Sequence, residues 1–297
     1  MVFPDTFSRH ILPDQLHILN VSFMVPTMRR DFGGCAGNIA YNLHAIGGSA
    51  RPMGTVGEDF APYAQWLDDL GIARDHVTVV PETYTAQAFI TTDMDDNQIT
   101  AFHPGAMGES HRNHVGDAGN VTLGIVAPDG RDGMIAHARE FAEAGIPFIF
   151  DPGQGLPMFD GPQLTRFIDQ AAYVCVNDYE ARLLANTTGC TVEALSRKTQ
   201  AFVITKGAQG SEIRAGGRVY EIPAVKPERV LDPTGCGDAY RAGLLLGLEK
   251  GWDWETSGRA AALLGALKIA HAGTQNHRID AAEFADRFAA TFGYRFT

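Results

Sequence analysis

The strongest constraint on the fold is an alternation of two hydrophobic periods in the second half of this 297-residue chain. From about residue 120, short apolar runs alternate with longer segments in which apolar residues recur every three to four positions. Predicted strands cover 121–127, 146–153, 173–177 and 201–207, and predicted helices cover 134–145, 164–172 and 179–189. Apolar strands separated by amphipathic helices are typical of a parallel sheet covered on both faces. We therefore predict an α/β fold with a mostly parallel sheet and helices on both of its faces.

Two later segments depart from this alternation. Residues 211–224 predict a β-hairpin that turns at Gly216-Gly217. The last helix is predicted to begin at Asp280, because Glu283 follows three residues later as in a capping box. Phe284, Phe288 and Phe292 then repeat at intervals of four, which predicts a stripe of core residues, not a ligand site.

The first third of the chain contains strand-like segments without an alternation of strand and helix. These segments are 17–25, 85–93 and 98–105, and residues 94–97 predict a turn between the last two. We predict that they form a small β-sheet lid, inserted at about 16–32 and 83–105 into a single α/β domain spanning 1–297. No internal repeat or low-complexity linker divides the chain.

The composition excludes several classes of function. The formal net charge is −11, which disfavours nucleic acid and anionic membranes as partners, and the adjacent Arg29-Arg30 is expected to be solvated. No apolar run approaches the length of a membrane span, and the first residues show no secretory signal pattern. The four cysteines show no zinc-binding spacing, which favours reduced, partly buried thiols in a cytoplasmic protein.

A glycine-rich segment with one acid, "DPTGCGD" at 232–238, predicts the chemistry. No Walker P-loop, dinucleotide fingerprint or protein-kinase motif set occurs in the chain. Gly235 and Gly237 allow close approach of a ligand, and the amides of residues 235–238, Cys236 included, would form an anion site at a helix N-terminus. Asp238 in such a site is interpreted as a general base that deprotonates a hydroxyl, and a helix-capping role is the alternative.

Two segments resemble the signatures of the ribokinase/PfkB carbohydrate kinases. "DPTGCGDAYRAG" is similar to the C-terminal signature of that family, and "FGGCAGNIAYNLHAIGG" at 32–48 is similar to its second signature. The resemblance extends over nearly the whole chain and implies a ribokinase-like fold. It places Gly33, Gly34 and Asn38 at the acceptor, and catalysis at Asp238 with the 235–237 loop.

The resemblance also implies a nucleotide side of the site. The residues expected there are Asn177, Glu180, Thr205, Gly207, Gly210 and Gly265. ATP and Mg²⁺ are the implied cofactors, with Glu180 holding Mg²⁺ through water. The loop "GTQNH" near residue 275 resembles the family's loop beside the adenine and a monovalent-cation site, and Asp232 would serve K⁺ there. From the residues alone, the alternative for Glu180 is a carboxylate at the start of a helix. The alternative for residues 205–210 is a hairpin turn.

The acceptor is expected to be the 5′-hydroxyl of adenosine or a related nucleoside, because the chain most resembles adenosine-kinase-type bacterial members. Phe23, Met24, Phe89 and Phe102 would form either a purine slot or, more simply, the lid's own core. His103, at the end of a lid strand, is a candidate for substrate contact, and a structural role at the lid edge is the alternative. A sugar kinase of the ribose or fructose type is the alternative activity, and a homodimer through the lid is expected.

The beginning of the chain departs from the family pattern. Members open with a glycine-bearing strand and then an aspartate that binds two sugar hydroxyls, whereas "MVFPDTF" corresponds to the residues after that aspartate. Asp5 lies too close to the lid segment to replace it. We expect Met1 to be internal to a longer native protein, with loss of the strand as the alternative. As given, one strand position of the sheet would be open. A nucleoside- or sugar-binding protein with little turnover is therefore a second class of function.

Overall fold

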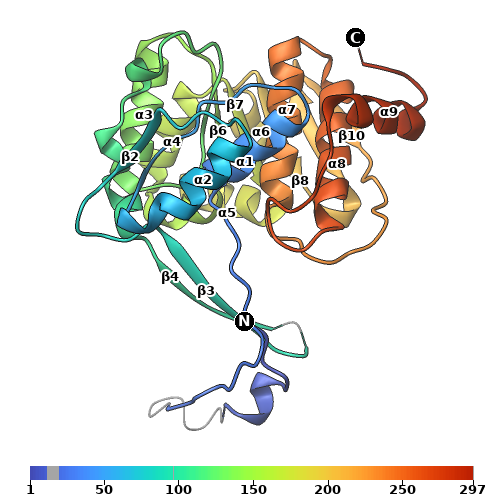
Figure 1. Cartoon of the computed structure of the whole chain (residues 1–297). Coiled ribbons are helices and arrows are strands. Elements are labelled where there is room, and N and C mark those ends of the chain that lie inside the picture. Colours follow the sequence, from blue (N-terminus) through green and yellow to red (C-terminus); the bar gives the residue numbers. More distant parts are fainter. Residues whose placement is uncertain (12–19, 96, 297) are drawn as a thin grey trace.

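The computed structural model describes residues 1–11, 20–95 and 97–296, and its centre is a six-stranded sheet (Figure 1). The strand order is β10-β9-β8-β7-β6-β5. The strands are β5 (Gly124–Val126), β6 (Phe148–Phe150), β7 (Tyr173–Asn177), β8 (Ala201–Thr205), β9 (Ser211–Ala215) and β10 (Arg218–Ile222). Strands β5 to β8 are parallel, and β9 and β10 are antiparallel to their neighbours. The predicted mostly parallel sheet and the hairpin turning at Gly216-Gly217 are both confirmed.

Helices cover both faces of this sheet, as predicted. One face packs against α3 (Arg131–Glu143), α4 (Gly161–Gln170), α5 (Asp178–Thr188) and the short α6 (Val192–Ser196). The other face packs against α1 (Cys35–Ala45), α7 (Cys236–Lys250), α8 (Trp254–Ile269) and α9 (Ala281–Phe292). Successive side chains of β6 point to opposite faces of the sheet. Phe148 and Phe150 therefore pack in the core under α3 to α6, and Ile149 packs in the core on the other face.

The C-terminal helix begins where it was predicted, but only one of the two hydrogen bonds of a capping box forms, because the Glu283 carboxylate bonds Arg287 instead. Asp280 is the N-cap of α9, and its carboxylate accepts a hydrogen bond from the Glu283 amide at 2.8 Å. Phe284 and Phe288 are fully buried, and the half-buried Phe292 packs against the same core. The aromatic stripe is therefore core packing.

The first third contains a βαβ unit that the sequence analysis missed. β1 (Met53–Val56) and β2 (His76–Val79) pair in parallel and are joined by a connection that contains α2 (Ala61–Asp69). The prediction that this third lacks alternating strand and helix is wrong. Their residues, MGTV and HVTV, mix polar and apolar types, so no continuous apolar run marks either strand in the sequence. Within the described residues no ladder joins this pair to the six-stranded sheet.

The lid is an antiparallel hairpin of β3 (Gln87–Thr92) and β4 (Gln98–His103) that projects from the α/β body (Figure 1). The strand predicted at 17–25 is not confirmed. Residues 12–19 lie outside the described residues, and 20–25 form no strand. The edge of β3 is paired instead with the first residues of the chain, because Phe3 N donates to Thr92 O at 2.9 Å and Thr92 N to Met1 O at 3.0 Å.

The apolar lid residues divide into two groups. Phe23 packs against Phe3 and Phe7, with ring centroids 4.8 and 5.0 Å apart, so the prediction of a small lid core is confirmed for Phe23. The same prediction is wrong for Met24, Phe89 and Phe102, whose exposed fractions are 84%, 51% and 55%. The homodimer through the lid stays a prediction.

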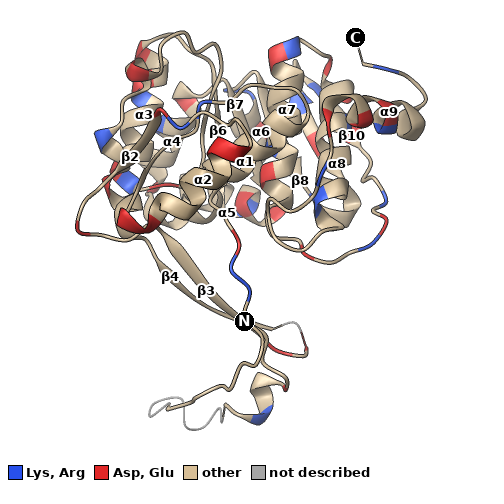
Figure 2. Ribbon diagram, in the orientation of Figure 1, with Lys and Arg blue, Asp and Glu red and all other residues tan. Residues whose placement is uncertain are grey.

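Charge is mixed over the surface of the protein. Figure 2 shows acidic and basic residues interspersed over the helices of the body. None of the helices in the described residues combines the length and the apolar character needed to cross a membrane. The four cysteines are free, with Cys175 buried and the others half-buried, as expected.

Helices α7 and α8 pack unusually closely, which explains why so many residues of α7 are small. A Cβ at Gly243 would lie 2.6 Å from the Ala261 Cα, and one at Gly247 would lie 2.6 Å from the Ser257 Cβ. Both distances are shorter than atoms in contact allow. The small residues therefore set the separation between the two helices.

We expect Gly243→Ala to lower the free energy of unfolding by about 1–3 kcal/mol, because the added methyl group meets backbone atoms of α8 that cannot move freely. Gly265→Ala is the matched control on α8, since its Cβ would lie at an ordinary 3.7 Å from the Cys236 carbonyl oxygen. That control should be neutral or stabilising by up to about 1 kcal/mol. Urea unfolding followed by circular dichroism measures both, and equal stability of the two variants contradicts the packing argument.

Candidate active site

Two helix N-termini meet at Asp238. α1 begins after Gly34 and α7 after Gly235, and these glycines have φ values of 85° and 82°, in the left-handed region that favours glycine. Asn38 in the first turn of α1 donates from its Nδ2 to the Asp238 Oδ2 at 2.8 Å. The positive ends of two helix dipoles therefore face the carboxylate and the space in front of it.

The loop before α7 provides amides for an anion, with one correction. The amide of Cys236 donates to the Pro233 carbonyl at 3.1 Å, because this bond closes the turn that starts the helix. The prediction that all four amides of 235–238 are unpaired is therefore wrong for Cys236. Among the hydrogen bonds of the described residues, none uses the amides of Gly235, Gly237 or Asp238. These three N–H groups can bind an anion.

The Asp238 carboxyl has the properties of a general base. It is half-buried, and burial raises its pKa from 3.8 to about 6, while the hydrogen bond from Asn38 opposes this rise. The nearby charges of Asp151 and Arg241 act in opposite directions, the first raising and the second lowering the pKa. At neutral pH the group is deprotonated and has a much higher proton affinity than an exposed aspartate.

A buried ion pair that the sequence analysis missed lies beside this base. Arg241 follows Asp238 by three residues on α7 and forms two hydrogen bonds with the Asp151 carboxylate, at 3.0 and 2.9 Å. Both residues are at most 5% exposed. The signal was present in the sequence, since Asp151 directly follows a buried strand and Arg241 lies within the glycine-rich signature. This pair attaches the start of α7 to the carboxyl end of β6.

A chain of hydrogen bonds holds Asn38. Its Oδ1 accepts from the Gln275 Nε2 at 3.0 Å, and the same Nε2 donates to the Tyr63 hydroxyl at 2.6 Å. The Tyr63 hydroxyl in turn donates to the Gly33 carbonyl at 2.9 Å. The structure thus brings together Gly33, Asn38 and Asp238, and it places Gln275 of the "GTQNH" loop beside Asn38. A substrate contact of Gly33, Gly34 or Asn38 stays a prediction.

The residues predicted for the nucleotide lie at the carboxyl edge of the sheet. Asn177 ends β7 and Thr205 ends β8, and the two are partners in the strand register. Asn177 and Glu180 form a complete capping box at the start of α5, with both bonds at 2.7 Å. Burial raises the pKa of the Glu180 carboxyl. The local geometry therefore explains both residues as a helix cap, and roles in nucleotide or metal binding stay predictions.

The glycines predicted beside the nucleotide have clear structural roles. Gly207 and Gly210 bound the turn between β8 and β9, with φ values of 57° and 85°. A Cβ at Gly210 would lie 2.1 Å from the Ile222 carbonyl oxygen, so only glycine fits there. Gly265 on α8 faces the anion loop, since its Cβ would lie 3.7 Å from the Cys236 carbonyl oxygen. Contact of these three with a nucleotide stays a prediction.

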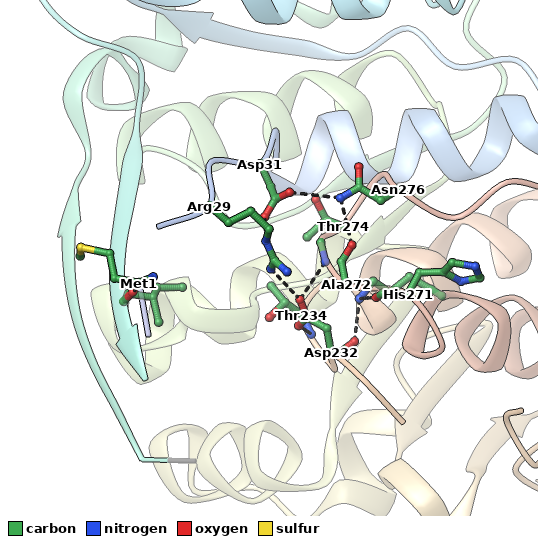
Figure 3. A network of polar contacts seen from close by, with 12 residues as sticks. Met1, Arg29, Asp31, Asp232, Thr234, His271, Ala272, Thr274 and Asn276 are labelled. Carbon is green, nitrogen blue, oxygen red and sulfur yellow. Dashed lines mark hydrogen bonds and ion pairs between the residues drawn. The ribbon is translucent and has the colours of Figure 1, made fainter. Parts of the chain in front are cut away.

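Asp232 lies in a polar network with the loop that follows α8 (Figure 3). Its Oδ2 accepts hydrogen bonds from the Gly273 amide at 2.9 Å and from the Arg29 Nη2 at 3.2 Å. Asp31 bonds both Arg29 and Asn276. Arg29 and Arg30 are both exposed, as expected, and Arg29 also takes part in this ion-pair network. Among the described residues, no group of three His, Cys, Asp or Glu side chains could hold a metal ion.

His103 is not brought to the base by the contacts of the described residues. It ends β4 and is exposed, and its Nε2 would lie 3.3 Å from a Cβ at Gly105. Asp5 is also in the lid, where its carboxylate bonds the Thr6 amide and the His10 ring. A substrate contact of His103 stays a prediction.

Comparisons with known proteins agree with this geometry. A model of the pfkB family carbohydrate kinases matches residues 9–281. A nucleoside kinase from Burkholderia thailandensis, solved in complex with inosine, superposes with a TM-score of 0.92 and 56% identity over 99% of this chain and 95% of that one. The same kinase has also been solved in complex with ADP-inosine.

Two relatives with lower identity are also kinases. A nucleoside kinase from Methanocaldococcus jannaschii is 30% identical over 260 residues, which cover 87% of this chain and 85% of that protein. A ribokinase from Bacillus subtilis is 28% identical over 251 residues, which cover 82% of this chain and 83% of the ribokinase.

We expect Asp238→Asn to stabilise the protein at neutral pH. The folded-state pKa of about 6 exceeds the usual 3.8, so the folded protein binds this proton more tightly than the unfolded chain does. Stability due to Asp238 is therefore lost as the pH rises from about 4 to about 6. Asparagine does not titrate, so the variant should gain about 1–3 kcal/mol relative to the wild type above that window and nothing below it.

Urea unfolding at a series of pH values measures this gain. Asp132→Asn on the exposed surface of α3 is the control for the replacement of an aspartate by asparagine. A constant difference between Asp238→Asn and wild type across the whole window contradicts the raised pKa.

Proposed function

The chain belongs to the pfkB family of carbohydrate kinases, and on that premise we propose that it transfers the γ-phosphoryl group of ATP to the 5′-hydroxyl of a purine nucleoside. The family membership makes it a phosphotransferase with an alcohol acceptor. We propose adenosine as the first substrate, and inosine, a similar purine nucleoside, as the second. The observation that carries the proposal is the Asp238 carboxylate, held by Asn38 in front of two helix N-termini.

In the proposed reaction Asp238 accepts the proton of the acceptor hydroxyl. The hydroxyl oxygen then forms a bond to the γ-phosphorus, the bond from that phosphorus to the bridging oxygen breaks, and ADP leaves with the electron pair. The amides of Gly235, Gly237 and Asp238 would bind the phosphoryl oxygens as charge develops. Binding at a helix N-terminus requires no reorganisation of these donors during the reaction.

Magnesium fits the residues near the nucleotide side. Mg²⁺ is usually held by one or two carboxylates together with substrate phosphates, and not by a protein cage. Glu180 has one carboxylate oxygen in the capping box and is half-buried, so its second oxygen would hold the ion through water. When bound, Mg²⁺ supplies positive charge that offsets the phosphate charges.

The relatives support a nucleoside as acceptor over a free sugar. The Burkholderia thailandensis protein, at 56% identity, is a nucleoside kinase solved with inosine, whereas the Bacillus subtilis ribokinase is 28% identical. A pure binding protein is disfavoured, because binding alone gives no reason to place a carboxylate with a raised pKa in an anion site.

We expect ADP release from ATP and Mg²⁺ with adenosine and with inosine, and little with ribose or fructose. A coupled assay with equal concentrations of the four acceptors measures this directly. Turnover of ribose or fructose without turnover of either nucleoside contradicts the purine acceptor but leaves the phosphoryl-transfer proposal intact. Absence of turnover with all acceptors contradicts both.

We expect Asp238→Asn to lower kcat by about 10²–10⁴-fold, because the acceptor hydroxyl then has no base. The dissociation constant for adenosine should change by less than about threefold, since the carboxylate acts mainly in the transition state. Wild-type kcat/KM should fall about tenfold per pH unit below about 6, where Asp238 is protonated, and be level above it.

Steady-state kinetics and calorimetry test these values, with Asp132→Asn as the control that keeps full activity. A turnover number near that of the wild type in Asp238→Asn would exclude Asp238 as the base.

A further inference from the structure

A lysine that the mechanism above does not use bonds Asp232, the residue that was expected to serve K⁺. Lys268 lies in the last turn of α8 and is fully buried. Its ammonium donates to the Asp232 carbonyl at 2.6 Å and to the His271 carbonyl at 3.3 Å. A lysine is rarely fully buried unless its charge is compensated, so this side chain requires an explanation.

The oxygens around this ammonium are of the kind that bind a monovalent cation. Potassium is bound by backbone carbonyl oxygens that replace its water shell. The Asp232 and His271 carbonyls are such ligands, and they come from two different loops, one before α7 and one after α8. The Lys268 ammonium is a compact single positive charge, so it can occupy the same oxygens.

The Asp232 carboxylate is also satisfied without an added ion. Its Oδ1 accepts from the Thr234 amide at 3.0 Å, and its Oδ2 accepts from the Gly273 amide and from Arg29 (Figure 3). Burial would raise the pKa of this carboxyl, yet these hydrogen bonds lower it on balance. A potassium ion would have to displace donors already in place and would lie beside the charges of Arg29 and Lys268. The site therefore does not fit K⁺.

The two loops joined by Lys268 carry the catalytic geometry. The Asp232 loop leads directly to the amides at Gly235 and Gly237 and to Asp238. The loop after His271 carries Gln275, which bonds Asn38 and thereby positions the base. A cation between the two loops would fix the anion site relative to the residue that holds Asp238.

We propose that Lys268 is a built-in cation that takes the place of K⁺, so that the protein needs no monovalent cation. Lys268 is then a positioning residue for phosphoryl transfer, and this role rests on the proposed function. Lys268 acts through the two loops that it joins, and the phosphoryl-transfer step is the one described above.

The first test is the cation dependence of the wild-type protein. With ATP, Mg²⁺ and adenosine or inosine, rates in choline, sodium, potassium and ammonium chloride at equal ionic strength should agree within about twofold. Activation by potassium of about tenfold or more overturns the proposal.

The second test compares two neutral replacements of different size. Lys268→Ala removes the charge and leaves space, so its rate in choline chloride should fall about tenfold or more and be largely restored by potassium or ammonium. Lys268→Met removes the charge but fills the space, so it should lose activity and not be restored. Lys250→Ala on the exposed end of α7 is the control with unchanged activity. A loss of activity in Lys268→Ala that neither potassium nor ammonium restores contradicts the proposal.

A readout without turnover separates this inference from the proposed function. Potassium should raise the unfolding temperature of Lys268→Ala relative to choline, and should not do so for the wild type or Lys268→Met, because only the alanine variant has room for the ion. If no acceptor is phosphorylated, the proposed function fails while this comparison still tests the cation site. Equal potassium effects on all three proteins overturn the built-in cation.

Discussion

The contact between Asn38 and Asp238 is the interaction on which the site depends. It joins the first turns of α1 and α7, which are 200 residues apart in sequence, and it holds the carboxylate where burial raises its pKa to about 6. The glycines before the two helices make this approach feasible, since both have positive φ. The cost is a partly desolvated charge at neutral pH, and functional sites commonly carry such a cost.

The contacts around α7 hold the Asp238 carboxylate in place despite that cost in free energy. The Arg241–Asp151 pair is buried and has two hydrogen bonds, so removing one partner would leave an uncompensated charge beside Asp238. Close packing of Gly243 on Ala261 fixes α7 on α8, and Lys268 at the end of α8 reaches back to the loop before α7. Contacts with the sheet, with α8 and with the Asp232 loop therefore hold α7 and its Asp238 carboxylate in position.

Local sequence patterns were sufficient to predict much of the fold. Strands β5 to β8, the hairpin at Gly216-Gly217 and the cap and stripe of α9 were all predictable, because each lies in a clear apolar run, turn signal or helical repeat. Strands β1 and β2 were missed, because their residues, MGTV and HVTV, mix polar and apolar types and no continuous apolar run marks them. In the lid, the edge of β3 pairs with the first residues of the chain, a long-range pairing that no local pattern reveals.

The sequence by itself determined the elements of the site: a loop of small residues, an acid and the start of a helix at 235–238, and a second glycine-bounded helix start at Gly34. Only the tertiary structure decided which side chains meet. It gave Asp238 the amide of Asn38 as a partner, placed Gln275 behind Asn38, and brought the Lys268 ammonium to the backbone carbonyl of Asp232. The physical reason is that hydrogen bonds and ion pairs act over a few ångströms in space, and separation along the chain carries no information about them.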